Sequence, residues 1–416
     1  MHPFTTVFLA ALALSTAFKL YLAYRHAAYV RKHRVQVPES FSAEVSLAAH
    51  QKAADYTCAK TRFGAFGTVV DALVLLLFTL GGGLAAAEQM VASALGPGIA
   101  RGVALVALVA ILAALVDLPL SLYRTFRIEA RFGFNTMSAK LFFIDVLKSA
   151  LVSMLLGLPL LALILWLMDQ AGSRWWLYAW AVWVTFNLAV IAIYPSVIAP
   201  LFNRFSPLQD DTLKARIEHL LSRCGFRSQG LFVMDGSRRS THGNAYFTGF
   251  GRSKRIVFFD TLLARLNHAE IEAVLAHELG HFKHKHVLKR MLWLFSLSLG
   301  VFWLLGELML TDWFYYALGV PTPSTAMALL LFFLTMPVFT FLLQPLAGLY
   351  SRRHEFEADH YAAHNASGVD LKRALIKLYK DNASTLTPDP WHSAFYDSHP
   401  PAAERVAHLE LTAQGA

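Results

Sequence analysis

Cysteine and charge are both scarce in this chain of 416 residues. Its 2 cysteines, Cys58 and Cys224, stand far apart and form no Cys-x-x-Cys pair, which argues against a disulfide framework and a thiolate zinc site. Any bound metal must therefore use histidine and carboxylate ligands. Charged residues make up 16% of the chain and hydrophobic residues 56%, above the roughly 45–50% apolar content of soluble domains. This excess predicts a protein that folds in a lipid bilayer.

Several apolar runs are long enough to cross a bilayer as helices. The first run has no cation before it and is followed by Arg25, Arg31 and Lys32, so we expect a retained helix rather than a cleaved signal peptide. The predicted fold class is an α-helical integral membrane protein with seven transmembrane helices. Their expected ranges are 4–24, 65–87, 102–123, 149–168, 175–201, 287–310 and 325–349.

Basic residues are unevenly distributed among the connections between these runs. Connections 25–64 and 124–148 are rich in Lys and Arg, whereas 88–101, 169–174 and 311–324 hold only Arg101 and Arg174. By the positive-inside rule, the basic connections are cytoplasmic. The net charge of +9 is then explained by headgroup attraction and topology, and nucleic acid is not an expected partner.

This alternation divides the chain into four consecutive parts. Residues 1–201 carry the first five spans, 202–286 form a polar segment, 287–350 carry the last two spans, and 351–416 form a second polar segment. We predict that both polar segments lie together on the cytoplasmic side.

The strongest motif in the chain is His277-Glu278-Leu279-Gly280-His281. On a helix the two histidines lie one turn apart on one face and can bind a single ion, while Glu278 leans toward the open position of that ion. Asn267 as N-cap, with Glu270 three residues later, predicts the start of such a helix. Because this motif also arises by chance, a metal site needs a third ligand.

A third histidine placed as in HExxHxxGxxH proteases is excluded, because Val287 occupies that position. His284 and His286 follow the motif beside lysines, and we expect them to be solvated or to face headgroups rather than to bind the ion. The remaining option is a side chain from a later helix.

The segment 351–359, Ser-Arg-Arg-His-Glu-Phe-Glu-Ala-Asp, directly follows the last span. Glu355 and Asp359 lie one helical turn apart, so one offers a ligand and the other an acceptor for the free N–H of a ligating histidine. Glu357 or His354 would serve as alternative ligands, and an ordinary charged helix is the alternative without function.

The HELGH helix running into a span, followed after the next span by SRRHEFEAD, resembles the type I CAAX prenyl endopeptidase family of integral-membrane zinc metalloproteases. Further segments in the same order extend the likeness over nearly the whole chain: 126–129 with 133–135, 243–247, and 398–401 with 404–405. The resemblance implies one zinc ion on His277, His281 and Glu355, with Asp359 behind the ligands. It also implies seven helices that enclose a water-filled intramembrane chamber.

Three protein ligands leave zinc a fourth position for water, whose pKa falls toward about 7. Glu278 would then act as general base. The carbonyl oxygen that gains charge needs a further donor. The resemblance makes His399 and Arg405 candidates, because this His-Pro-Pro segment folds back over the active site in that family. Without the resemblance, the His399-Pro400 pair would indicate only a turn.

Short strands are expected at 231–235, 243–249 and 255–260. An exposed edge around Asn244, Ala245 and Tyr246 would hold an extended substrate by main-chain hydrogen bonds. The alternative is a small hairpin that only braces the metal helix.

The leading interpretation is an endopeptidase that cuts near the C-terminus of short or prenylated peptides, a specificity that rests wholly on the resemblance. The alternatives are a quality-control membrane metalloprotease, and a transporter or scaffold with a structural metal site. Structural zinc sites usually have four protein ligands and need no base, so Glu278 argues against the last class. Expected partners are a peptide and the bilayer, and a monomer is compatible with the sequence. The C-terminal residues 411–416 show no retention signal, so a bacterial cytoplasmic membrane is the expected location.

Overall fold

The computed structural model describes residues 2–248 and 255–414, so the predicted strand 243–249 and the segment 411–416 both end outside the described residues. Within the described part, seven helical stretches are long and apolar enough to cross a membrane, as the sequence predicts. They are Pro3–His33 (α1), Leu47–Phe78 (α2), Ile99–Glu129 (α4 and its π-helical end), Ala139–Gln170 (α5), Gly172–Phe202 (α6 to α7), His286–Leu308 (α11) and Thr325–Asn365 (α13 to α14).

The second span differs most from its predicted range of 65–87. Helix α2 begins at Leu47 and ends at Phe78, and a separate helix, α3, covers Gly83–Ala94. Gly82 adopts a φ of 79°, and a Cβ on Gly81 would lie 2.8 Å from the carbonyl oxygen of Leu77. The glycine triplet therefore ends the helix, because only glycine tolerates this turn so close to the preceding backbone.

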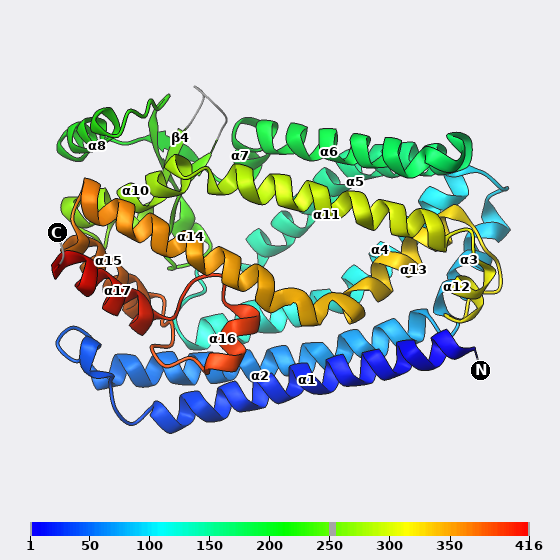
Figure 1. Cartoon of the computed structure of the whole chain (residues 1–416), viewed down its shortest axis with the longest axis horizontal. Coiled ribbons are helices and arrows are strands. Elements are labelled where there is room, and N and C mark those ends of the chain that lie inside the picture. The colour runs from blue at the N-terminus through cyan, green and yellow to red at the C-terminus, as the bar shows by residue number, and fades with distance from the viewer. Residues whose placement is uncertain (1, 249–254, 415–416) are drawn as a thin grey trace.

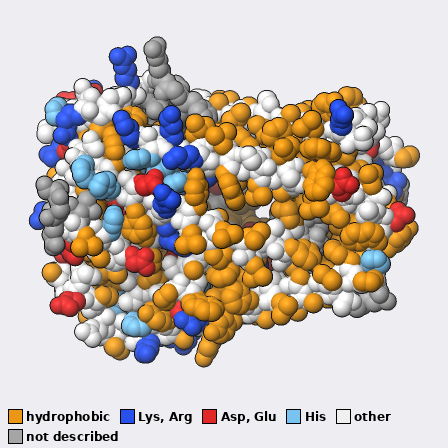
Figure 2. All heavy atoms as spheres, in the orientation of Figure 1, with side chains coloured by type: hydrophobic (Ala, Val, Ile, Leu, Met, Phe, Trp, Pro, Cys, Tyr) orange, Lys and Arg blue, Asp and Glu red, His pale blue; other side chains and the backbone are white. Residues whose placement is uncertain are grey.

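The spans pack on their neighbours in one core but leave much of their surface exposed. In each of the first six, at most 22% of the most apolar window is buried inside the protein. In Figure 1, α1 and α2 run along one side and α6 and α11 along the other. Figure 2 shows the apolar surface hollowed near its middle. Asp71 and Asp117 are exposed within the spans, as expected for ionisable groups that face a cavity. These observations agree with the predicted intramembrane chamber.

A four-stranded sheet lies at one end of the spans, in the order β1-β2-β4-β3. Strands β3 and β4 pair antiparallel, whereas β2 runs parallel to β4, so the three predicted strands join one sheet. Strand β1 was not predicted, because three residues that include a proline carry no periodic signal. The strands are β1 (Phe205–Pro207), β2 (Leu231–Met234), β3 (Ala245–Thr248) and β4 (Arg255–Phe259).

The two polar segments share one hydrophobic core beside this sheet. Ile217 of α8, Phe258 of β4, Leu279 of α10 and Leu371 of α15 are all almost fully buried in it. Burial of each such side chain contributes about 1.5–3 kcal/mol. Figure 2 shows charged and histidine side chains gathered over this end of the molecule. The helices here are α8 (Asp211–Arg223), α9 (Asp260–Leu263), α10 (His268–Lys283), α15 (Gly368–Asp381), α16 (Pro390–Tyr396) and α17 (Ala402–Gln414).

The long spans are subdivided where their geometry changes. The last one is bent by a 3-10 turn at Phe341–Leu343, so α14 carries the segment 351–359 as a direct continuation of the membrane helix. The remaining bounds are α4 (Ile99–Tyr123), α6 (Trp175–Ile193), α7 (Ala199–Phe202), α12 (Asp312–Tyr316), α13 (Thr325–Thr340) and α14 (Gln344–Asn365).

Candidate metal centre

Helix α10 begins as its capping residues predict. The Asn267 side chain accepts a hydrogen bond from the Glu270 backbone N–H at 2.9 Å, and the Glu270 carboxylate accepts one from the Asn267 N–H at 2.9 Å. Ile271, Leu275 and Leu279 then bury one face of the helix in the core. The cap and this apolar face fix the rotation of α10, which turns His277 and His281 toward α14.

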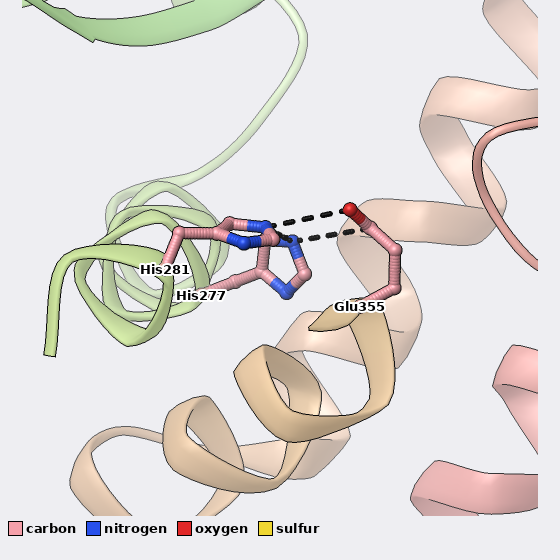
Figure 3. A group of neighbouring side chains, drawn as sticks. All are labelled: His277, His281 and Glu355. Atoms are coloured by element: carbon pink, nitrogen blue, oxygen red, sulfur yellow. Dashed lines mark hydrogen bonds and ion pairs between the residues drawn. The ribbon is translucent and has the colours of Figure 1, made fainter. Parts of the chain in front are cut away.

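The structure brings His277, His281 and Glu355 together (Figure 3). The two histidine Nε2 atoms lie 3.2 Å apart. The Glu355 carboxylate reaches them with Oε2 at 3.5 Å from His277 Nε2 and Oε1 at 3.4 Å from His281 Nε2. We call these three residues the metal triad.

The metal triad fits a divalent ion in spacing and chemistry. Tetrahedral coordination at Zn–N distances of 2.0–2.1 Å requires ligand atoms about 3.3 Å apart, close to the separations of 3.2–3.5 Å seen here. Glu355 Oε2 is buried and has no hydrogen-bond partner among the described residues. A buried oxygen without a donor is costly, and a cation at the centre of the triad would satisfy it.

Gly280 explains how α14 comes so close to α10. A Cβ at this position would lie 2.9 Å from Ala358 Cα and 3.1 Å from Tyr361 Cβ. A methyl group could not fit there without moving the backbone of α14, so the absence of a side chain at Gly280 lets the turn of α14 that carries Glu355 lie against the histidines.

Asp359 binds the far side of His277, as expected from its spacing to Glu355. Its Oδ1 lies 2.8 Å from His277 Nδ1. The buried guanidinium of Arg405 donates to both carboxylate oxygens of Asp359, and its Nη1 lies 3.6 Å from Glu355 Oε2. Arg405 therefore contacts the carboxylates around the triad from α17, a helix distant in sequence.

The prediction that His286 is solvated is wrong. His286 is fully buried, its Nδ1 lies 2.9 Å from His281 Nδ1, and its Nε2 lies 2.9 Å from Glu357 Oε2. Lys285 adopts a left-handed φ of 57°, which ends α10 and turns His286 back toward His281. The sequence pattern suggested one continuous helix and gave no sign of this break. His284 is exposed, as predicted.

Glu357 and His354 were the alternative third ligands, and both contact His286 instead. Glu357 forms the hydrogen bond to His286 and a salt bridge to Arg353 at 3.2 Å. His354 stacks on the His286 ring with centroids 3.9 Å apart. The geometry thus selects Glu355 as the carboxylate of the triad.

Glu278 is half-buried and lies on the same turn of α10 as His277 and His281. Burial raises the pKa of its carboxyl above the ordinary value, and the charge of Glu355 acts in the same direction while His277 opposes it. Burial lowers the pKa of His281 to about 3, which keeps this imidazole neutral and able to bind a metal.

His399 reaches the metal triad from the segment before α17. Its Nε2 lies 3.5 Å from Glu355 Oε1, and its side chain keeps 62% exposure. His399 is therefore accessible beside the triad, whereas Arg405 is only 4% exposed and is already paired with Asp359.

Asn244, Ala245 and Tyr246 lie on or beside β3, which is one of the two edge strands of the sheet. The backbone oxygen of Asn244 accepts from the Phe259 N–H, and Ala245 and Tyr246 pair with β4. The other edge of β3 pairs with no strand among the described residues. Phe247 packs on Phe282 of α10 with ring centroids 5.0 Å apart, which places β3 next to the metal helix.

Comparison with known proteins finds family matches over almost the full chain. Residues 26–204 match the family model described as CAAX prenyl protease N-terminal, five membrane helices, and residues 207–413 match peptidase family M48. CAAX prenyl protease 1 of Saccharomyces cerevisiae is 33% identical over 96% of this chain and 93% of its own length. An Arabidopsis thaliana homologue is 40% identical over 71% of this chain and 70% of its own length.

A solved structure gives the same result for the fold. The crystal structure of S. mikatae Ste24p superposes with a TM-score of 0.92 at 32% identity, covering 98% of this chain and 99% of that one. Together with the seven spans and the triad geometry, these similarities show that the chain belongs to the CAAX prenyl protease 1 family of peptidase family M48, and is a multi-pass membrane metalloendopeptidase.

Proposed function

We propose that this protein is a zinc endopeptidase that cuts near the C-terminus of CAAX-type substrates, including prenylated ones. The observation that carries the proposal is the metal triad together with Glu278, which lies on the same turn of α10 as His277 and His281. Relatives matched over most of their length are named CAAX prenyl protease 1, which supports the substrate class.

The donor set favours zinc. Two imidazoles and one carboxylate are the ligands of thermolysin-type catalytic zinc sites, which keep one position open. The metal we propose is thus held by His277, His281 and Glu355. Zinc in this site would supply a Lewis acid that lowers the pKa of a water molecule and polarises the scissile carbonyl.

Glu278 is proposed as the general base. It accepts a proton from the attacking water at a carboxylate oxygen and returns it to the nitrogen of the leaving amine. Its raised pKa suits this double role, because a carboxylate with a higher pKa is the stronger base.

His399 is proposed as the donor to the carbonyl oxygen, since its Nε2 lies at the triad and remains accessible. Arg405 is proposed as a positioning residue that acts through Asp359 and Glu355, because its guanidinium is buried against them. This division differs from the expectation that both residues face the substrate.

The substrate backbone is proposed to pair with the free edge of β3 at Asn244, Ala245 and Tyr246, as an added strand would. The basic connections 25–64 and 124–148 support a cytoplasmic location for the active site. A bacterial cytoplasmic membrane as the home of the protein stays a prediction.

The test is cleavage of a farnesylated CAAX peptide by purified Glu278→Gln protein. We expect the rate to fall by roughly 10²–10⁴-fold, with bound zinc unchanged because Glu278 is not a ligand. Glu218→Gln on the exposed face of α8 is the matched control and keeps the rate of the unaltered protein.

Cleavage at the unaltered rate by Glu278→Gln would remove Glu278 as the base. Cleavage by the unaltered protein that continues after a chelator has removed all metal would remove the metal mechanism as well.

A further inference from the structure

A groove of about 1020 Å3 lies between α2 and the end of α4. We call it the interfacial groove and define it by its two kinds of wall. The cationic wall is made by Arg62, Arg127 and Arg131, and the apolar wall by Phe63, Phe66 and Tyr123. None of these residues belongs to the metal centre.

The cationic wall has no carboxylate paired with it among the described residues. Asp55, which acts electrostatically on Arg131, is itself bound to Arg34. No carboxylate lines the groove, and in the described ranges none of the three guanidinium groups takes part in a salt bridge. All three arginines are exposed. Three like charges on one concave surface attract an anion.

The groove opens on the outer side of the helices. One face of α2 carries Arg62, Phe66, Leu73 and Leu77, because the successive spacings of four, seven and four residues return to the same side of a helix. The last three of them are exposed, at 56%, 60% and 61%, and an exposed apolar stripe on a membrane helix faces lipid. Asp71 falls on the opposite face, within electrostatic range of Lys19 and Asp117.

The two walls lie at different membrane depths. Arg62 precedes the apolar run of α2, and Arg127 and Arg131 follow the apolar run of α4. Phe134, a few residues further on, stacks on His242 of the polar part with ring centroids 4.5 Å apart. The arginines are thus at headgroup level, with Phe66 deeper in the hydrocarbon.

We propose that the interfacial groove binds one anionic phospholipid. Its phosphate lies against Arg62, Arg127 and Arg131, because a single guanidinium group can donate two parallel hydrogen bonds to two phosphate oxygens. Its acyl chain runs along Phe63, Phe66 and Tyr123. The apolar wall selects a lipid over a soluble phosphate, which would leave those rings exposed.

Native mass spectrometry of the full chain released from nanodiscs tests this proposal. The nanodiscs contain equal amounts of phosphatidylglycerol and phosphatidylcholine, which share acyl chains and differ in net charge. We expect one retained phosphatidylglycerol per chain. Arg127→Gln with Arg131→Gln should lower its retention by roughly 25-fold, at about fivefold for each arginine near the surface.

The matched control is Arg31→Gln with Lys32→Gln. These two cations are exposed at the end of α1 and do not line the groove, so this control removes the same charge from a basic connection on the same side. Retention should stay within about twofold of the unaltered protein. Arg127→Lys with Arg131→Lys keeps the charge and should restore most of the retention.

Photolabelling of the unaltered protein gives a second readout that needs no variant. A phosphatidylglycerol with a photoreactive acyl chain should label the segments around Phe66 and Tyr123 above the other spans. Equal retention of the two lipids, equal losses in the control and groove variants, or labelling spread evenly over all spans would each overturn the proposal.

Discussion

Each imidazole of the metal triad is connected to a further carboxylate, directly for His277 and through His286 for His281. His277 is bound through Nδ1 to Asp359, which Arg405 holds in place. His281 is bound through Nδ1 to His286, which contacts Glu357 in turn. Such partners fix the tautomer and ring orientation of a ligating histidine. Both carboxylates lie on α14, but the two chains of contacts share no residue, since one continues to Arg405 of α17 and the other runs through His286 of α11.

Asp359→Asn should lower zinc affinity by roughly 10–100-fold, because an amide orients the His277 ring less strongly than a carboxylate. It should also destabilise the fold by about 3–5 kcal/mol, because Arg405 loses a buried charged partner. Competition with a chelating dye measures the first effect and thermal unfolding the second. Asp211→Asn on exposed α8 is the control. Unchanged zinc affinity in Asp359→Asn would contradict this role.

His286→Gln should weaken zinc binding by roughly 10–100-fold as well, because His281 loses the partner of its Nδ1. His284→Gln is a closely matched control, since His284 is exposed and only two residues away. Titration with zinc under a competing chelator compares the two variants. If His284→Gln weakens zinc binding as much as His286→Gln does, the loss of affinity does not come from the contact between His286 and His281.

At the scale of elements, the site depends on one helix crossing. Helices α10 and α14 meet where Gly280 lies against Ala358 and Tyr361, and Glu355 projects from the same stretch of α14. A larger residue at the crossing would push the carboxylate away from both histidines.

Gly280→Ala should therefore cost about 1–3 kcal/mol of stability through overpacking and lower zinc occupancy. Gly300→Ala in α11 is the control, because nothing lies within 4 Å of a Cβ at that position, and alanine is favoured over glycine in a helix by up to about 1 kcal/mol. Thermal unfolding and metal analysis give the two readouts. Full zinc occupancy in Gly280→Ala would show that the crossing tolerates a methyl group.

At the scale of the whole molecule, the distribution of basic residues sets the orientation of the protein in the membrane. The basic connections, the sheet and the metal centre lie at one end of the spans, and the loop after α3 lies toward the other. The positive-inside rule assigns the first end to the cytoplasm.

Cysteine labelling in cells measures this orientation. In a background of Cys58→Ala and Cys224→Ser, Gly96→Cys after α3 should react with an impermeant maleimide in intact cells. Gln209→Cys beside β1 should react only after the membrane is opened. The reverse pattern would invert the assigned topology.

The spans and the helix of the HELGH motif were predictable because their signals are local. Apolar runs, the Asn267 cap and the spacing of His277 and His281 each lie within a few residues. Span edges were less predictable, since the helices continue into polar sequence and the turn at Gly81–Gly83 ends α2 early. The role of His286 was missed because it depends on a single left-handed residue, Lys285.

The sequence by itself determined that the chain crosses a membrane and carries two histidines and a glutamate on one helix turn, because hydropathy and helical spacing are properties of neighbouring residues. Only the tertiary structure showed that Glu355 lies against both histidines while Glu357 contacts His286, that Arg405 is buried beside Glu355, and that arginines from α2 and α4 share one groove. Those facts join residues far apart in the chain, and they depend on where helices cross rather than on any local pattern.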